Sequence, residues 1–162
     1  MNDLRLASAM HIMLSLAYAV REGVDLLTST ELARGLSANP ALVRKLLVPL
    51  VRNGLVESFQ GKNGGVRIAK PAREITLRAV YEAVSPDKKV FFARMRIEHI
   101  CAISSNIESI FSDLSNEMED ALLQVLSQHT VQQYLDEIVS KERKRSGARS
   151  LPNIGSSEYI SL

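Results

Sequence analysis

Start and stop signals for two helices dominate one part of this sequence. The stretch TSTE at residues 28–31 matches a capping box, in which a threonine hydroxyl and a glutamate side chain each satisfy a free backbone N–H group. Further on, Asn39 is a strong N-cap residue, and Pro40 suits the first helical position because its φ is already fixed. The dipeptide Asn53-Gly54 marks a helix end. The sequence therefore predicts a short helix, a tight turn and a longer helix that ends before Asn53.

A predicted β-hairpin follows directly. The runs LVESF at residues 55–59 and VRIAK at residues 66–70 read as two short strands, with QGKNGG as their connection. Asn63-Gly64 is a favoured turn dipeptide because both residues tolerate positive φ. Two helices joined by a tight turn, with a hairpin behind them, form the plan of a winged helix-turn-helix. The predicted fold class is mainly α with a small β-hairpin wing.

Two further helices are expected to complete this domain. Residues 4–21 carry apolar side chains at three- and four-residue steps, and TLRAVYEAV at residues 76–84 reads as a closing helix. We divide the chain into a winged helix-turn-helix domain at 1–85, a linker with dimerisation helices at 86–140, and a basic tail at 141–162 that we expect to be disordered. The first helix is expected to bury Leu6, Met10, Met13, Leu14, Ala17 and Val20.

A long helix that begins near Ser104 is predicted to carry a dimer seam. Its apolar residues recur at steps of four and three, a heptad-like pattern with one extra residue. Because the winged domain is expected to close its own core, we interpret the seam as a homodimer contact; the alternative is an ordinary helix packed on its own domain. The predicted dimerisation residues are Ile103, Ile107, Ile110, Leu114, Met118, Ala121 and Val125.

Composition limits the classes of protein. With 162 residues, of which 46% are hydrophobic, the chain can bury the core of one domain plus an extension. Its single cysteine, Cys101, excludes an intrachain disulfide and any metal site built from several cysteines of one chain. No apolar run approaches the roughly 20 residues of a membrane span. We therefore expect a cytoplasmic protein with no signal peptide and no membrane contact.

Charge is unevenly divided along the chain. Residues 1–84 hold 11 Lys/Arg against 7 Asp/Glu, whereas residues 85–162 hold 9 against 11. The first half is therefore the one that could face a polyanion. A solvated surface of mixed charge explains so small an imbalance equally well, so the position of the charges must decide.

The helix predicted from Pro40 presents positive charge on one face. A helix-turn-helix offers such a face to the major groove of DNA. Arg44 lies one turn past the N-cap, where a guanidinium can form a bidentate contact with guanine, and Lys45 is placed to meet a phosphate. The alternative is that both are solubilising surface charges. The expected buried stripe is Leu42, Val43, Leu46 and Leu50, and the expected exposed face is Ala41, Arg44, Lys45, Val48 and Arg52.

The hairpin and the start of the first short helix supply further candidate contacts. Lys62 lies at the tip of the hairpin, where the neighbouring glycines allow the backbone to approach a sugar-phosphate chain; a plain tight turn would use the same Asn-Gly pair. Ser29 and Thr30 could receive a phosphate at a helix start, or could simply cap it. The predicted DNA-binding residues are Ser29, Thr30, Asn39, Pro40, Ala41, Arg44, Lys45, Lys62, Asn63, Gly64 and Gly65.

One residue conflicts with the predicted helix. Pro49 falls inside it and removes the hydrogen bond to the Lys45 carbonyl, at a cost of about 3 kcal/mol unless the helix kinks. We therefore expect a bend there, beyond the turn that would read DNA.

The stretch SANPALVRKLLVPLVRNGLVESFQGKNGGVRIAKPAREITLRAVYEAV, with RLASAMHIMLSLA upstream, resembles the Rrf-type winged-helix regulators of bacteria. This family includes the iron-sulfur assembly regulator, the nitric-oxide-sensing repressor and the cysteine-metabolism repressor, and the resemblance covers roughly residues 1–130. It implies a homodimer with crossed long helices that binds a pseudo-palindromic operator in double-stranded DNA, usually as a repressor. By position, Asn39 to Lys45 and the wing from Gly61 to Gly65 are the reading elements.

The sequence departs from this family at the sensor. Members that bind an iron-sulfur cluster place three cysteines just before the long helix, whereas EHICAISSNIESIF has only Cys101. Glu98, His99 and Cys101 form only a weak metal-binding pattern. We predict no cofactor and no metal. Cys101 is then a redox-sensing thiol or a small packed residue.

Two other classes of protein compete with a regulator. A winged-helix module that binds protein would use the same surface but would show no salt-dependent affinity for DNA. An enzyme is disfavoured because Cys101 has no partner fixed by a motif, and His11, His99 and His129 are scattered along the chain.

Overall fold

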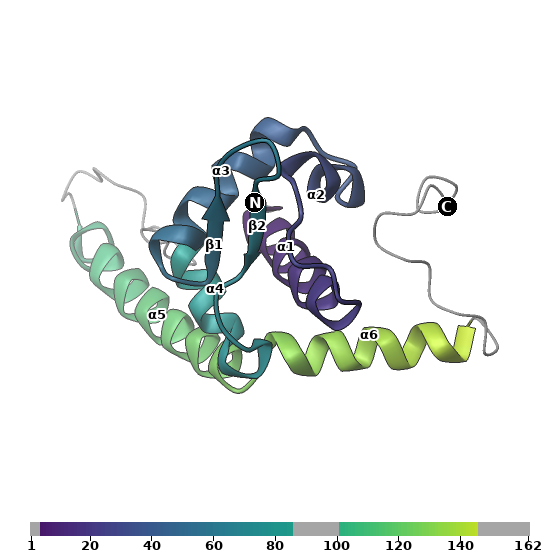
Figure 1. The fold of residues 1–162 in the computed structure, drawn as a ribbon. Helices are drawn as coiled ribbons and strands as arrows, with labels where there is room; N and C mark the ends of the chain where they lie inside the picture. Colours follow the sequence, from purple (N-terminus) through teal and green to yellow (C-terminus); the bar gives the residue numbers. More distant parts are fainter. Residues whose placement is uncertain (1–3, 86–100, 146–162) are drawn as a thin grey trace.

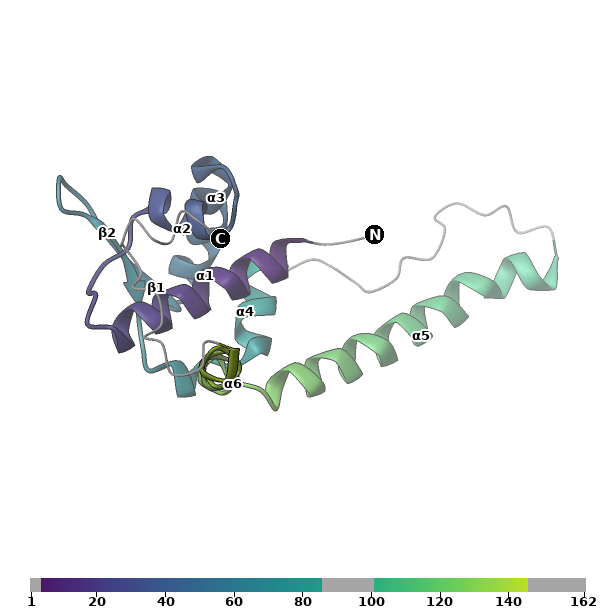
Figure 2. The same cartoon turned by 90° about the vertical axis from the view of Figure 1, so that its right-hand side faces the viewer.

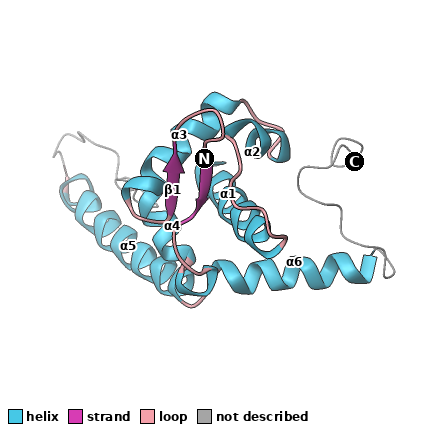
Figure 3. Cartoon of the chain, viewed as in Figure 1, coloured by secondary structure: helices cyan, strands magenta, loops and turns pink. Residues whose placement is uncertain are grey.

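The computed structural model describes residues 4–85 and 101–145, and this part of the chain is mainly helical with one two-stranded antiparallel sheet (Figure 1, Figure 3). The predicted fold class is confirmed. Glu98, His99 and the end of the expected tail lie outside the described residues. The elements in chain order are α1 (Leu4–Arg21), α2 (Ser29–Gly35), α3 (Pro40–Arg52), β1 (Val56–Phe59), β2 (Gly65–Ile68), the 3-10 turn η1 (Ala72–Glu74), α4 (Leu77–Val84), α5 (Ala102–Ser127) and α6 (Val131–Arg145).

Both predicted helix starts, those of α2 and α3, are present with their caps. The Thr28 hydroxyl accepts a hydrogen bond from the Glu31 backbone N–H at 3.2 Å, and the Glu31 carboxylate accepts one from the Thr28 N–H at 2.7 Å. At the start of α3, the Asn39 side-chain oxygen accepts from the Ala41 N–H at 2.8 Å. Ser37, with a φ of 49°, turns the chain between the two helices. Local side-chain bonds therefore fix where each helix begins.

The core gathers around α1, which contacts α3, α4, β2 and α6. Ile12, Met13 and Leu16 of α1 and Leu50 of α3 are at most 1% exposed. Each fully buried side chain of this size contributes about 1.5 to 3 kcal/mol. The buried apolar residues of all these elements form one cluster, so the described residues share a single core.

Several apolar residues differ in burial from the prediction, including Ile12 and Leu16 of α1, which were not in the expected buried set and are at most 1% exposed. Leu42 of α3 was expected in the buried stripe and is 44% exposed, whereas Leu47 is 7% exposed. Successive residues of a helix are ~100° apart, so a stripe centred between Val43 and Leu47 turns Leu42 outward. Val20, at the end of α1, was also expected to be buried and is 56% exposed because Ala19 faces the core there.

Helix α3 continues through Pro49 and ends at Arg52. Asn53 is the C-cap of this helix. The Pro49 carbonyl accepts hydrogen bonds from the Asn53 backbone N–H at 3.1 Å and from the Asn53 side-chain amide at 2.8 Å. These bonds satisfy an acceptor of the last turn. The bend expected at Pro49 stays a prediction.

The wing is the β1–β2 hairpin, in which Val56 pairs with Ile68 and Phe59 with Gly65. The expected turn at Asn63-Gly64 is wrong in its conformation, because the left-handed residue of this loop is Gly61, with a φ of 106°. Gly64 is required for another reason: a Cβ there would overlap the backbone carbonyl of Phe59 across the loop. Close approach of backbone, rather than a positive φ, therefore explains this glycine.

Helix α6 completes the core, a role that was not predicted from the sequence. Its Val131, Leu135 and Val139 are at most 5% exposed and belong to the same buried cluster as α1. The expected division of the chain is therefore corrected in two respects. The segment 1–85 does not close its own core, and the residues from 141 to Arg145 are helical rather than a disordered tail.

A short set of backbone hydrogen bonds, here called the clasp, fixes the start of α6 to the winged domain. Thr76 and Thr130 form an isolated antiparallel bridge, and the Val131 N–H donates to the Ile75 carbonyl at 2.9 Å. Helix α5 leaves this junction and extends away from the rest of the fold (Figure 2). The clasp therefore anchors one end of α5 as well.

Within residues 4–85 and 101–145, no helix combines the length and the apolar character that crossing a membrane requires.

We expect Leu135→Ala to lower the free energy of unfolding by about 2 to 5 kcal/mol, because it opens a cavity where α6 meets the core. The matched change Ile138→Ala, at a residue that is 48% exposed on the same helix, should cost no more than about 0.5 kcal/mol. Chemical denaturation followed by circular dichroism measures both. Equal losses in the two variants would contradict the role given to α6.

Candidate nucleic-acid interface

The start of α3 and the tip of the wing lie at the same end of the molecule, at the top of Figure 1. The turned view keeps them on one side, with α5 and α6 toward the opposite end (Figure 2). Helix α3 contacts both α2 and β1, which fixes the helix pair against the wing. One surface therefore contains the two elements that were predicted to read DNA.

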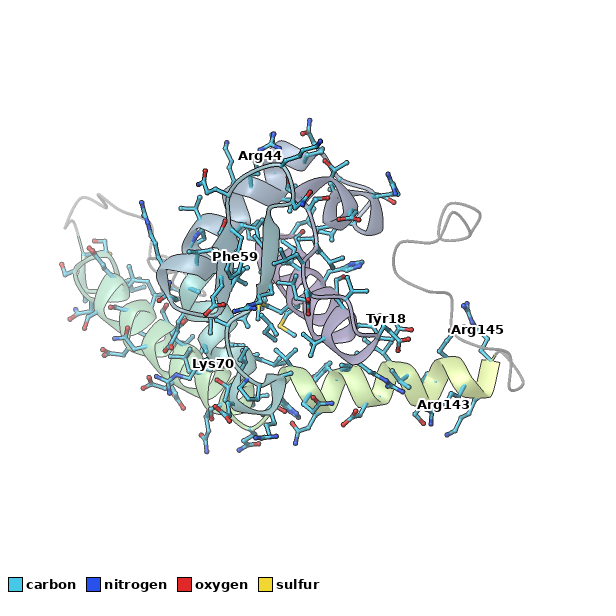
Figure 4. The ribbon with its side chains drawn as sticks, viewed as in Figure 1. Tyr18, Arg44, Phe59, Lys70, Arg143 and Arg145 are labelled. Atoms are coloured by element: carbon cyan, nitrogen blue, oxygen red, sulfur yellow. The ribbon has the colours of Figure 1, made fainter. Side chains whose placement is uncertain are left out.

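Arg44 is exposed at the top of α3, and its guanidinium donates a 3.4 Å hydrogen bond to the Ser29 hydroxyl at the start of α2 (Figure 4). The fold thus brings together two of the predicted residues that lie 15 positions apart. A bond this long between exposed groups is easily exchanged for another acceptor. Lys45, Ala41 and Asn39 are exposed on the same part of α3.

The start of α2 is already occupied by a carboxylate. The Glu31 side chain accepts hydrogen bonds from both the N–H and the hydroxyl of Thr28, each at 2.7 Å. A phosphate would meet this negative charge. This carboxylate weighs against a phosphate at the start of α2, where Thr28 is the cap. A DNA contact by Ser29 or Thr30 stays a prediction, and the Ser29 hydroxyl is the partner of Arg44.

At the wing tip, Lys62 and Asn63 are exposed, and Gly64 and Gly65 are partly buried behind them. No ion pair is described for Lys62 within residues 4–85 and 101–145. A Cβ on Gly65 would lie 2.9 Å from the Leu27 carbonyl, so this glycine allows the wing to join the loop before α2. The lysine is therefore the exposed charge of the tip, and the glycines shape the hairpin that carries it.

The sequence did not single out the charged pair on the wing. Arg67 donates to the Glu57 carboxylate at 2.8 Å, and its guanidinium lies 4.8 Å from the centre of the Phe59 ring. The two charged residues are direct partners in the strand register. Because the pair is neutral, Arg67 adds little charge to the surface. The opposite charges at these paired positions of the two predicted strands could have revealed the ion pair from the sequence.

The predicted seam of α5 is exposed along the described chain. Ile103 is 74% exposed, Ile110 60%, Leu114 45%, Met118 36% and Val125 54%. Ile107 is partly buried and Ala121 is exposed. Phe111, which is 45% exposed, belongs to the same exposed apolar set. The heptad-like pattern assigned the neighbouring Ile110 to the seam and so did not include Phe111.

The other side of α5 packs on its own domain. Ser115 is 2% exposed, and the Tyr81 hydroxyl of α4 donates to the Glu119 carboxylate at 3.2 Å. The seam is thus distinct from the surface by which α5 contacts α4.

Cys101 is exposed immediately before α5. Hydrogen bonds to its sulfur from the Ser104 backbone N–H, the Ser104 hydroxyl and the Ile103 backbone N–H lower the pKa of the Cys101 thiol below its ordinary value. The Ser104 hydroxyl lies 3.6 Å from the sulfur. An exposed thiol with a lowered pKa carries more of the reactive thiolate near neutral pH. Cys101 is thus exposed rather than packed within the described residues, and a redox-sensing role for it stays a prediction.

The donors of this chain do not fit an iron-sulfur cluster. Such clusters are held mainly by cysteine thiolates, commonly four of them, or by two cysteines and two histidines in Rieske centres. The chain has one cysteine and three histidines in all, and residues 4–85 and 101–145 contain no group of three His, Cys, Asp or Glu that could hold a metal ion.

A capped helix pair, an exposed Arg-Lys step and a glycine-shaped hairpin define a winged helix-turn-helix protein. The family described as Rrf2, iron-dependent transcriptional regulator, matches residues 3–137. The chain belongs to the Rrf2 family of transcriptional regulators, which are not enzymes.

Individual relatives agree with this assignment. The protein aau3 of Rhizobium meliloti is 45% identical over 62 residues, which are 38% of this chain and 40% of that protein. The helix-turn-helix regulator IscR of Cereibacter sphaeroides is 34% identical over 76 residues, 47% of this chain and 49% of that protein. The chain thus spans less than half the length of each. A crystal structure from Lactobacillus plantarum, described as a transcriptional regulator, matches in fold with a TM-score of 0.71 and 22% identity, covering 88% of this chain and 98% of that one.

We expect alkylation of Cys101 by iodoacetamide to reach half of its maximal rate at a pH below the ordinary pKa of a cysteine, since the thiolate is the reactive form. Ser104→Ala removes the hydroxyl bond and should move this midpoint upward, whereas Ser105→Ala should leave it in place. Mass spectrometry over a pH series gives the rates. Identical midpoints in all three proteins would contradict the contribution assigned to the Ser104 hydroxyl.

Proposed function

We propose that the protein is a homodimeric, cytoplasmic, sequence-specific DNA-binding regulator that acts as a repressor without an iron-sulfur cluster. The observation that carries the proposal is the placement of exposed Arg44 and Lys45 at the start of α3, on the same end of the molecule as the Lys62 wing tip. Helix starts of this kind enter the major groove, and wings reach the neighbouring backbone.

The chemistry of each side chain suggests its role. Arg44 can exchange its long bond to Ser29 for the paired acceptors O6 and N7 of guanine. Lys45, a compact point charge, suits a phosphate oxygen. Lys62 and the neighbouring wing backbone suit phosphate or sugar contacts, which position the protein without specifying sequence.

The exposed seam of α5 supports the dimer. A row of large apolar side chains left in water is unfavourable, and a second copy of the same helix would cover it. A two-fold dimer presents two α3 helices, so its operator would be pseudo-palindromic with half-sites about one helical turn or a multiple of it apart. A dimer bound across a promoter would block access to it, which is the basis for proposing a repressor.

Fluorescence anisotropy tests the proposal directly. A duplex from upstream of the protein's own gene is compared with a random duplex of equal length over a salt series. Tighter binding to the upstream duplex, weakening as salt rises, supports specific recognition through base and phosphate contacts. Equal weak binding contradicts specificity for that duplex. No binding at low salt favours a protein-interaction module instead.

We expect Arg44→Ala to cost about 1 to 3 kcal/mol of operator affinity and to relax specificity at one base position, because it removes a contact to a base edge. Lys45→Ala should weaken binding to all sequences alike and reduce the salt dependence by about one counterion. Arg78→Ala on α4, away from this surface, serves as the control. Operator affinity unchanged by Arg44→Ala would remove that residue from the reading surface.

We expect the wild-type protein to have a mass in solution of about twice the 17.9 kDa of one chain, and Leu114→Glu to shift it to the monomer by placing a charge in the seam. Gln124→Glu adds the same charge at an exposed polar position of α5 and should leave the dimer intact. Light scattering after gel filtration measures the mass. A Leu114→Glu protein that remains dimeric would place the interface elsewhere.

A further inference from the structure

We propose that a groove between the end of α1, the base of the wing and α6 binds a small organic anion with an apolar body. The groove has a volume of about 640 Å³, within the range of roughly 300 to 1,000 Å³ found for small-molecule sites. It lies away from the Arg44 end of α3. The proposed DNA contacts therefore do not account for it.

The floor of the groove is apolar. Val20 and Ala17 come from α1, Ile68 from β2 and Leu135 from α6, and Pro71 closes the loop beyond the wing. Val20 is 56% exposed although it stands beside the core, so the fold leaves apolar surface uncovered at this place. An apolar group bound there would remove that surface from water.

The rim of the groove carries a positive excess. Arg21, Arg67 and Lys70 line it against the single acid Glu57. Because Arg67 is paired with Glu57 at 2.8 Å, the remaining charges are those of Arg21 and Lys70. Arg21 lies 3.7 Å from the carboxylate of Glu22, a weak exposed contact.

Lys70 stands out at this rim. It is exposed, and no ion pair or hydrogen bond is described for it within residues 4–85 and 101–145 (Figure 4). An ammonium group above an apolar floor suits a carboxylate or a phosphate ester whose organic part enters the groove.

The positive rim continues along α6. A second hollow of about 660 Å³ shares Arg21 and Gln132 with the first and adds Arg143, Lys144 and the acid Asp136. Arg143 projects from the outer half of α6 (Figure 4). The combined groove therefore has room and charge for a second anionic group at the far end of a longer ligand.

The walls of the groove are fixed by backbone bonds. The Ala69 N–H donates to the Leu55 carbonyl at 3.0 Å, and the Val131 N–H donates to the Ile75 carbonyl at 2.9 Å. A ligand would thus meet a preformed site that touches the wing and α6 at once. Whether this ligand changes the affinity for DNA depends on the proposed function. Binding of the ligand itself does not, so the test of the site uses no DNA.

The test is a titration of the full ¹⁵N-labelled chain followed by NMR, with 3-phenylpropionate and phenyl phosphate as anionic probes and 3-phenylpropionamide as the matched neutral probe. We expect both anions to give saturable shifts at the backbone amides of Ile68, Ala69 and Leu135. We expect the amide to bind more weakly. Lys70→Gln and Arg21→Gln should each raise the dissociation constant of the anions about fivefold.

Arg34→Gln removes an exposed positive charge from α2, outside the groove, and should leave probe affinity unchanged. Thermal melts confirm that the variants, all at exposed positions, are folded. Three results would overturn the proposal: no shift at these amides with either anion at millimolar concentration, equal binding of the neutral amide, or wild-type affinity in both Lys70→Gln and Arg21→Gln.

Discussion

Enclosure of α1 is the packing constraint on which the rest of the structure depends. Ile12 and Met13 are completely buried because α3, α4, β2 and α6 each cover part of the helix. One of these partners comes from the far end of the described chain. The helix pair and the wing therefore depend on a segment that begins only at Val131, and α5, which lies between α4 and α6 in sequence, is anchored by the same packing.

The features that were predicted well from the sequence are those that depend on a few consecutive residues. The caps at Thr28 and Asn39 depend on bonds between near neighbours, and the wing strands are short runs of strand-forming residues that flank a Gly-rich connection, so their residue types reveal them. Burial on α3 was less predictable, since Leu42 and Leu47 have the same chemistry and the elements packed around α3 decide which of them is covered. The four-residue steps of Val131, Leu135 and Val139 were a local signal for the α6 helix, but they do not reveal which elements it packs against.

The candidate site shows the same division. Arg44, Lys45 and Lys62 could be named from charge and position, yet the bond from Arg44 to Ser29 and the neutral pair of Arg67 with Glu57 follow from the spatial arrangement of elements. Gly64 was chosen correctly for the wing but for the wrong physical reason. The groove beside Val20 was not foreseen, because three segments that are distant in sequence form it.

The isolated bridge between Leu27 and Val66 links the wing to the helix pair at the candidate nucleic-acid interface. Two backbone hydrogen bonds, of 3.0 and 2.8 Å, tie the second strand of the wing to the loop that leads into α2. Strand β2 is thereby bonded on both edges, to β1 on one side and to the loop before α2 on the other. Such a tether opposes changes in the spacing between α3 and the wing tip. In any complex with a duplex, adjustment of groove width would fall on the nucleic acid, and stiff and flexible base steps would be distinguished by the work needed to deform them.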